Sequence, residues 1–155
     1  MFVKRLMPVY LGIFILLFDQ YTKFLIKTNL FYGESITIIN GFFNIVFIKN
    51  DGAAWNILSG QRFVLIFISL IILLFLIFKG HEYFYSKKIH RICYGMLIGG
   101  IAGNLVDRIS TGMVIDFLDF QFGTYHYPSF NIADASICIA VILYFFTSQN
   151  NKHNP

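Results

Sequence analysis

Four long apolar runs constrain this chain more than any other feature of its sequence. Each holds about 15 to 21 residues, against the roughly 20 that a helix needs to cross a bilayer. The runs cover Leu6 to Ile26, Phe63 to Phe78, Ile92 to Val106 and Ile132 to Phe146. Because the chain is 57% hydrophobic and only 13% charged, these runs predict four transmembrane helices rather than a soluble globule. The second and fourth are short, which tilt, amphipathic flanks or a thinner bilayer would accommodate.

The remaining bulk features narrow the class of protein. A formal net charge of +4 would suit a nucleic-acid-binding protein, but the basic residues form no face or stripe, so we expect no nucleic-acid partner. Cys93 and Cys138 lie near opposite ends of separate predicted spans, too far apart for a disulfide, and we expect both to be buried apolar side chains. Lys4-Arg5 before an apolar run imitates a secretory signal. No small-x-small cleavage site follows, so we expect a retained first helix.

The basic residues near the spans predict the orientation of the protein. The loops on one side of the membrane, after the first and third runs, hold only Lys27, Lys49 and Arg62, with Lys23 and Arg108 near helix ends. The opposite side is richer in basic residues, and it holds Lys4, Arg5, Lys79, Lys87, Lys88, Arg91 and Lys152. We therefore expect both termini on the cytoplasmic side of the membrane.

A small β structure is predicted in the segment after the first helix. Ser35 to Ile39 and Phe42 to Ile48 are rich in β-branched and aromatic residues, and Asn40-Gly41 between them is a strong hairpin signal. Met113 to Phe120 is a further extended candidate. The expected fold is therefore one mainly α, polytopic membrane domain over residues 1–155. It has four transmembrane helices and an antiparallel β platform, about residues 33–55 and 113–120, on the extracytoplasmic face.

Glycines recur at four-residue intervals in the third apolar run, at Gly95, Gly99 and Gly103. This spacing places them on one helix face, where they allow a neighbouring helix to approach closely. A phosphate-binding loop would instead follow a strand. The spacing predicts helix packing.

Three polar clusters lie at the predicted outer ends of the helices. Within each cluster the spacing is i, i+3 or i+4, so its members share one helix face. The clusters are Asp19 with Lys23, Asn104 with Asp107 and Arg108, and Asn131 with Asp134. Each has a structural interpretation, as an interfacial ion pair, a polar network or a helix cap. Charge at a membrane span is costly, so three clusters converging on one side indicate a functional site.

A fourth source of carboxylates is the stretch Val114 to Phe120, which holds Asp116 and Asp119. In a strand, positions three apart point to opposite faces, so only one of the two can face the site. Periodicity does not say which. Zinc-binding, nucleophilic-serine and Walker motifs are absent from the sequence, and we expect no metal or cofactor. The histidines, His81, His90, His126 and His153, are isolated and are expected at the surface. Carboxylates remain as the catalytic candidates.

Five segments, in order along nearly the whole chain, resemble the signature blocks of bacterial lipoprotein signal peptidase, the signal peptidase II family of membrane aspartic peptidases. Trp55 stands where the family commonly has Phe, and Ile115 where it commonly has Val. Neither departure removes a polar group. The five segments are residues 19–23 (DQYTK), 50–55 (NDGAAW), 99–108 (GGIAGNLVDR), 114–117 (VIDF) and 130–134 (FNIAD).

The resemblance implies a role for each polar residue. Asp116 and Asp134 correspond to the catalytic aspartates, which selects Asp116 over Asp119. The implied structural supports are Asp19, Lys23 and Asp107, and the implied substrate-binding residues are Asn50, Gly52, Asn104, Arg108 and Asn131.

The implied substrate is a diacylglyceryl-modified prolipoprotein, cleaved just before its lipidated cysteine in the bacterial plasma membrane. We expect the enzyme to be a monomer surrounded by membrane lipids. Two close carboxylates share one proton, which suits general acid and base catalysis without a cofactor. The alternative is a small proton-coupled transporter or channel component. It would need polar groups through the depth of the membrane, whereas the cytoplasmic halves of these spans are almost purely apolar. A non-enzymatic scaffold would explain the glycines but not the outer charges.

Overall fold

A computed structural model describes residues 2–149, with side chains from residue 6 onward. Lys152 and His153, and the side chains of Lys4 and Arg5, lie outside this description. The helices are α1 (Phe2–Asn29), α2 (Arg62–Phe84), α3 (Lys88–Ser110) and α4 (Ile132–Gln149). All four are long and apolar enough to cross a membrane. Each extends past the apolar run that predicted it, because the polar residues at the run's edges are helical too.

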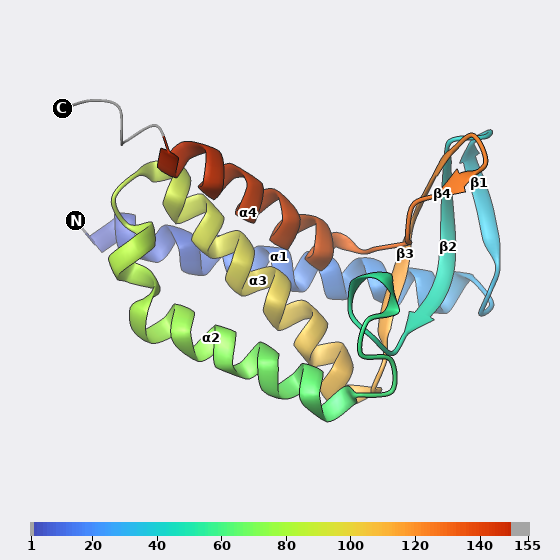
Figure 1. The fold of residues 1–155 in the computed structure, drawn as a ribbon, viewed down its shortest axis with the longest axis horizontal. Coiled ribbons are helices and arrows are strands. Elements are labelled where there is room, and N and C mark those ends of the chain that lie inside the picture. Colours follow the sequence, from blue (N-terminus) through green and yellow to red (C-terminus); the bar gives the residue numbers. More distant parts are fainter. Residues whose placement is uncertain (1, 150–155) are drawn as a thin grey trace.

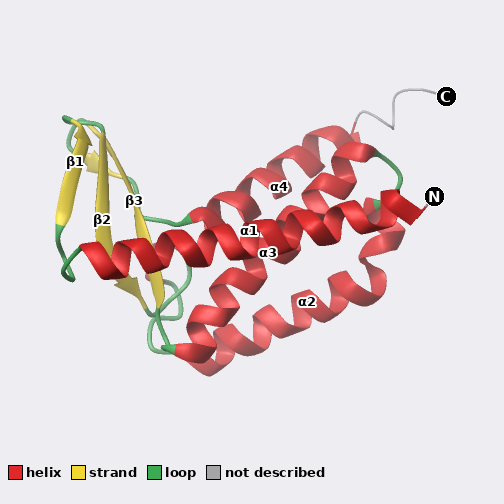
Figure 2. Ribbon diagram, turned by 180° about the vertical axis from the view of Figure 1, so that it is seen from behind, coloured by secondary structure: helices red, strands yellow, loops and turns green. Residues whose placement is uncertain are grey.

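The helices form a bundle with the β structure at one end (Figure 1). The beginning of α1 and the end of α4 lie together at the other end of the bundle (Figure 1). α3 packs against α1, α2 and α4 and has the most extensive buried surface, including Asn104, Asp107 and Arg108. Seen from behind, α1 runs the length of the bundle and its last turns reach the sheet (Figure 2). Polar residues of α1 and α3 therefore meet near the sheet end.

The predicted glycine face is confirmed at the contact between α1 and α3. A Cβ atom at Gly95 would lie 2.7 Å from the carbonyl oxygen of Pro8, and one at Gly99 would lie 2.5 Å from that of Gly12. Real Cβ atoms do not approach a backbone oxygen so closely. The glycines therefore allow the two helix backbones to touch, and this fixes the position of Asp19 relative to α3.

The sheet has four antiparallel strands in the order β1 (Ser35–Ile39), β2 (Phe43–Asn50), β3 (Val114–Phe122) and β4 (Tyr125–His126). The hairpin at Asn40-Gly41 is confirmed, and Gly41 has the positive φ of +70° that this turn requires. Asn50 at the end of β2 pairs with Val114 at the start of β3. The sheet thus brings Asn50 close to Asp116. The short strand β4 was not predicted.

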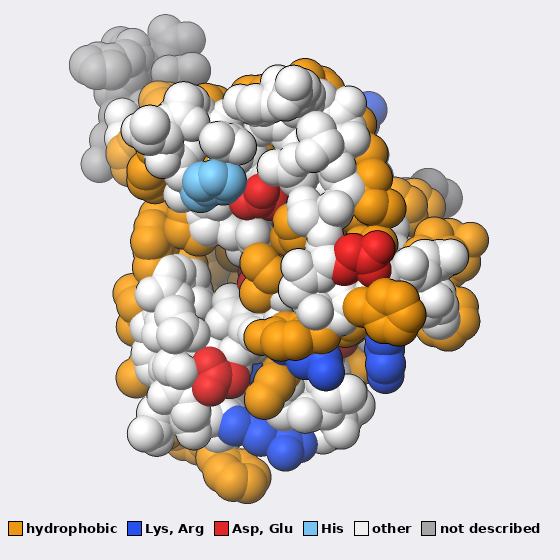
Figure 3. All heavy atoms as spheres, turned by 90° about the vertical axis from the view of Figure 1, so that its right-hand side faces the viewer, with side chains coloured by type: hydrophobic (Ala, Val, Ile, Leu, Met, Phe, Trp, Pro, Cys, Tyr) orange, Lys and Arg blue, Asp and Glu red, His pale blue; other side chains and the backbone are white. Residues whose placement is uncertain are grey.

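The sheet end presents a mixed surface. Figure 3 shows hydrophobic side chains between acidic and basic ones, with Lys and Arg gathered along the lower edge. Such a mixture is typical of a membrane–water interface. The exposed side chains of α2, by contrast, are almost all apolar, including Phe63, Phe67 and Phe78.

Two expectations for individual side chains were wrong. His90 is buried, with 3% of its surface exposed, because Ser86 hydrogen-bonds its Nδ1 and the ring packs on Tyr144. Cys138 is exposed, because the part of α4 that carries it faces the opening beside the sheet and not the bundle core. Cys93 is buried as expected, and both thiols are free.

Candidate active site

Asp116 of β3 and Asp134 in the first turn of α4 lie on the wall of one cavity. The side chain of Asn131 connects them. Its Nδ2 donates to Asp116 Oδ1 at 2.7 Å, and its Oδ1 accepts from the backbone N–H of Asp134 at 2.9 Å. One buried amide therefore links the carboxylate of Asp116 to the backbone of Asp134. Asn131 is fully buried, so this arrangement is shielded from competing water.

Asp116 is held by a second amide. Asn50 Nδ2 donates to Asp116 Oδ2 at 2.9 Å, and the orientation of that amide is set because Asn50 Oδ1 accepts from the N–H of Gly52 at 2.9 Å. Burial, and after it the neighbouring charge of Asp134, raise the pKa of Asp116 to about 7. Asp116 can therefore hold a proton near neutral pH, unlike an ordinary exposed aspartate.

Asp134 both caps α4 and faces the cavity. Its Oδ2 accepts from the N–H of Asn131 at 3.4 Å, which with the bond in the opposite direction forms a capping box. Its Oδ1 accepts from Asn104 Nδ2 at 2.7 Å. The predicted cap and the predicted site residue are therefore the same group, and the cap fixes its direction.

A buried lysine connects this site to the bundle. Lys23, 2% exposed, lies 2.7 Å from both Asp19 Oδ2 and Asp107 Oδ2 and donates to Asn104 Oδ1 at 3.1 Å. Asp19 Oδ1 in turn accepts from the N–H of Ala133 at 2.8 Å. The ammonium thus neutralises two buried carboxylates and orients the amide that binds Asp134.

Gln20 belongs to the same network, although it was not predicted as a site residue. Its Nε2 donates to Asp107 Oδ1 at 2.9 Å and to the carbonyl of Gly103 at 3.2 Å. The only sequence signal was its position beside Asp19, since its partners are more than 80 residues away in the chain.

Arg108 points away from Lys23 and toward the loop after β2. Its Nη2 donates to the carbonyl of Gly52 at 2.8 Å, while its buried Nε has no hydrogen-bond partner among the residues described. Gly52 admits no side chain, because a Cβ there would lie 2.9 Å from the carbonyl oxygen of Ile57. The sequence predicted Arg108, Asn104 and Asp107 as one cluster. In the structure Asn104 and Asp107 contact Lys23, whereas Arg108 lies on the cavity wall.

Asp119 lies on the other face of β3, as strand periodicity requires for one of the two aspartates. Asn44 Nδ2 donates to its Oδ2 at 3.0 Å. The β3 residues on the cavity wall are Val114, Asp116, Phe120 and Phe122, all at even positions. Asp119 is therefore separated from the site.

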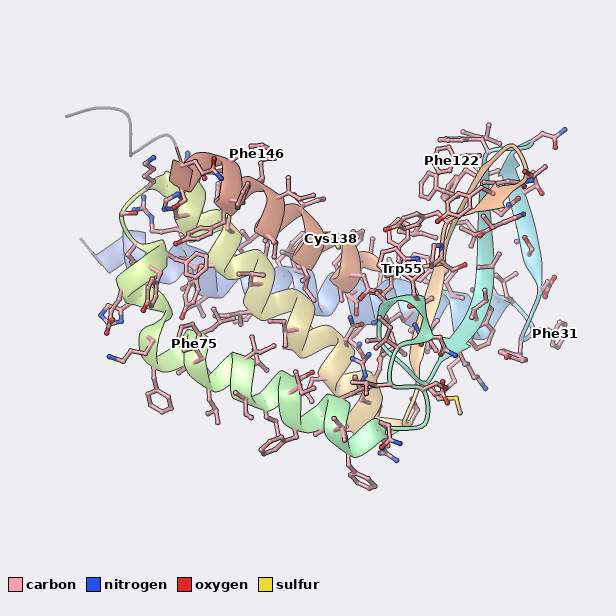
Figure 4. The ribbon with its side chains drawn as sticks, in the orientation of Figure 1. Phe31, Trp55, Phe75, Phe122, Cys138 and Phe146 are labelled. Atoms are coloured by element: carbon pink, nitrogen blue, oxygen red, sulfur yellow. The ribbon has the colours of Figure 1, made fainter. Side chains whose placement is uncertain are left out.

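The cavity has a volume of about 930 Å³ and lies between α4, the sheet and the loop after β2. Figure 4 shows Trp55, Cys138 and Phe122 around its opening. Its aromatic lining was not predicted, and it consists of Trp55, Phe120, Phe122, Tyr127 and Phe130. A polar end with two carboxylates and an apolar remainder suits a substrate that has both a peptide and a lipid part. Within residues 2–149, no group of three or more His, Cys, Asp or Glu side chains is placed to hold a metal ion.

Comparison with known proteins gives consistent matches. Residues 11–149 match the family model described as signal peptidase (SPase) II. Lipoprotein signal peptidases of Bacillus pumilus and Staphylococcus aureus are 42% and 40% identical to this chain. The first match covers 82% of both chains, and the second covers 94% of this chain and 90% of the other.

Two solved structures described as bacterial membrane enzymes share the fold. One has a TM-score of 0.88 at 36% identity, covering 96% of this chain and 90% of that one. The other has a TM-score of 0.77 at 37% identity and covers 91% of each.

Proposed function

This chain belongs to the signal peptidase II family and removes signal peptides from lipoproteins, and we propose that Asp116 and Asp134 are its catalytic pair. The observation that carries this assignment is Asn131, whose side chain binds the Asp116 carboxylate and whose backbone N–H binds the Asp134 carboxylate, on one cavity wall. The comparisons give no support to a transporter or channel component.

The chemistry follows from a pair that shares one proton. The ionised carboxylate removes a proton from a water molecule, whose oxygen attacks the scissile carbonyl carbon. The protonated carboxyl group donates its proton to the carbonyl oxygen, giving a tetrahedral intermediate. As the intermediate collapses, the C–N bond breaks and the protonated carboxyl group gives its proton to the leaving nitrogen. At the same time a hydroxyl group of the intermediate gives its proton to the ionised carboxylate. The pair then returns to its starting state, so no cofactor takes part.

Arg108 and Asn50 are placed to bind the substrate backbone. Arg108 Nε is buried, has no partner among the described residues and belongs to a side chain on the cavity wall. We propose that the guanidinium group of Arg108 binds a substrate carbonyl. Asn50 and Gly52 hold the adjacent wall, and Asn104 and Asn131 orient the pair. Asp19, Lys23 and Asp107 serve as buried structural support.

We further propose that the substrate carries a diacylglyceryl group and is cleaved just before the modified cysteine. The apolar part of the cavity, which reaches Cys138 and Ile139 on the exposed side of α4, would receive lipid chains from the bilayer. All of the proposed site residues come from one chain, which favours a monomer of 17.9 kDa. Light scattering of the detergent-solubilised protein would measure that mass.

Cleavage by purified protein tests the catalytic assignment. We expect Asp116→Asn and Asp134→Asn each to lower the cleavage rate of a diacylglyceryl-modified precursor by about 10³-fold or more. Asp119→Asn is the matched control, since it alters the same strand on the opposite face, and it should retain activity within a few-fold. Substantial cleavage by either variant of the pair would overturn the assignment. An unmodified precursor, expected to be cleaved poorly, tests the lipid requirement.

We also propose that both termini are cytoplasmic and that the sheet faces the outside. One support is that the beginning of α1 and the end of α4 lie at the end of the bundle opposite the sheet (Figure 1). The other is the set of basic residues where α2 connects to α3. In a background without native cysteines, Thr124→Cys should react with a membrane-impermeant thiol reagent in intact cells. Glu82→Cys should react only after the membrane is opened. The reverse pattern would refute this orientation.

A further inference from the structure

Arg62, the first residue of α2, binds the end of α3. Its Nε donates to the carbonyl of Arg108 and its Nη2 donates to the carbonyl of Ile109, both at 2.7 Å. The last carbonyls of a helix have no partner within the helix, and a planar guanidinium can satisfy two adjacent ones at once. No carboxylate in the described part of the chain forms an ion pair with Arg62. Its charge is therefore directed at the negative end of α3.

Arg62 also follows directly after the loop that forms one wall of the cavity. This wall loop, residues 53–61, contributes Ala53, Ala54, Trp55 and Asn56 to the cavity. Just before it, Gly52 accepts a hydrogen bond from Arg108 Nη2 at 2.8 Å. Both ends of the wall loop are consequently attached to the same residue of α3. The Arg108 side chain holds the start of the loop, and the Arg108 backbone carbonyl holds its end.

The same guanidinium packs against the turn from α3 to β3. A Cβ atom at Gly112 would lie 3.3 Å from Arg62 Nη1, and Gly112 has a φ of +84°. Only three residues, Thr111, Gly112 and Met113, separate the end of α3 from the strand that carries Asp116. Arg62 therefore contacts both the end of α3, where Arg108 lies, and the turn that leads into β3, and it directly follows the wall loop.

The wall loop needs such attachment because its own backbone is unfavourable. Trp55, Asn56 and Leu58 have positive φ values of 54°, 60° and 59°, which non-glycine residues adopt only when their surroundings hold them there. Trp55 is 63% exposed and contacts the ring of Tyr127 edge-on, and Leu58 is 41% exposed, so packing of their side chains supplies only part of this restraint.

We propose that Arg62 is a positioning residue for substrate binding, which holds the wall loop against the α3 terminus so that Ala53 to Asn56 form a fixed wall opposite α4. This role rests on the proposed function for its kinetic consequence. Arg62 itself does not contact the reacting atoms. Loss of the attachment should therefore weaken substrate binding while leaving Asp116, Asn50 and Asn131 in contact.

The test compares Arg62→Gln, which removes the charge and the fork, with Arg62→Lys, which keeps the charge alone. Lys27→Gln is the matched control, because it removes an exposed positive charge from the same end of the molecule. Each full-length protein is assayed in detergent for KM and kcat with a diacylglyceryl-modified precursor. The anisotropy decay of Trp55, the only tryptophan in the chain, reports motion of the wall loop without reference to catalysis.

We expect Arg62→Gln to raise KM about tenfold, since two charge-assisted hydrogen bonds are lost, while kcat stays within about threefold. Arg62→Lys should be intermediate and Lys27→Gln should match the parent. The Trp55 decay of Arg62→Gln should gain a nanosecond component at temperatures well below unfolding. A parental KM together with a parental Trp55 decay would overturn the proposal. So would a loss of kcat at parental KM, which is what a smaller fraction of folded enzyme produces. The Trp55 result remains decisive even if the catalytic pair has been assigned wrongly.

Discussion

The raised pKa of Asp116 predicts that its replacement by asparagine changes stability in a pH-dependent way. Burial and the charge of Asp134 raise this pKa to about 7, from an ordinary value of 3.8. The folded protein thus binds the proton more tightly than the unfolded chain, and the ionised carboxylate disfavours folding. The stability associated with the protonated group is complete below pH 3.8 and is lost as the pH rises to about 7.

The size of the effect follows from the shift of roughly three pKa units. At about 1.4 kcal/mol for each unit, the charged form lowers stability by about 4 kcal/mol above pH 7. Asparagine does not ionise, so Asp116→Asn removes this cost. It also places an NH₂ group against one of two amide donors, Asn50 Nδ2 or Asn131 Nδ2. The lost hydrogen bond costs about 2 kcal/mol at every pH.

Because of these two contributions, the difference in stability between Asp116→Asn and the parent changes sign with pH. At pH 8 we expect Asp116→Asn to be inactive yet more stable than the parent by about 2 kcal/mol, or roughly 4–8 °C in Tm. At pH 4 it should be less stable by a similar amount. The midpoint of this change should fall between pH 5 and 6, where the cost of the charge equals the cost of the lost hydrogen bond.

Thermal unfolding in a neutral detergent, followed by intrinsic fluorescence from pH 4 to pH 8, measures this difference. Thr124→Ala, which removes a neutral exposed side chain, is the control and should show a difference from the parent that does not vary with pH. A Tm difference for Asp116→Asn that is constant across the range, or that grows toward low pH, would refute the reasoning.

Three further outcomes are expected. The value of kcat/KM should fall about tenfold for each pH unit above 7 as the pair loses its shared proton, and a profile that is flat from pH 4 to 9 would contradict a shared-proton pair. Lys23→Met should cost about 3–5 kcal/mol in unfolding free energy, because it leaves Asp19 and Asp107 buried without their ammonium, whereas the exposed Lys27→Met should cost little. Gly95→Val should cost at least about 1–3 kcal/mol, because its Cβ would meet the carbonyl oxygen of Pro8, and a parental Tm would show that α1 and α3 separate easily.

Local patterns in the sequence predicted the elements that depend on local physics. The apolar runs predicted four helices, since any segment of that length and composition satisfies its backbone within a membrane only as a helix. Asn40-Gly41 predicted a hairpin because a tight turn needs a positive φ. The glycine spacing predicted a close helix contact, and the family resemblance identified the five polar segments.

Tertiary structure decided what each polar group does. Strand periodicity required Asp116 and Asp119 to face opposite ways, but only the packing of the sheet against α1 and α3 places Asp116 on the cavity wall. The sequence allowed Lys23 to be a simple i, i+4 partner of Asp19, whereas in the structure α3 also brings Asp107 and Asn104 to its ammonium group. Burial of that lysine depends on neighbours that are far away in the chain.

The sequence by itself therefore determined the spans, the hairpin and the set of polar residues from which the site is built. Periodicity and turn chemistry extend only a few residues along the chain, so they determine these features and no more. The contacts of Arg62 with the end of α3, of Gln20 with Asp107, and of Asn131 with Asp116 cross from one element to another. They exist only because α3 packs against its neighbours and the sheet closes over one end of the bundle. That packing decided which carboxylates face one cavity.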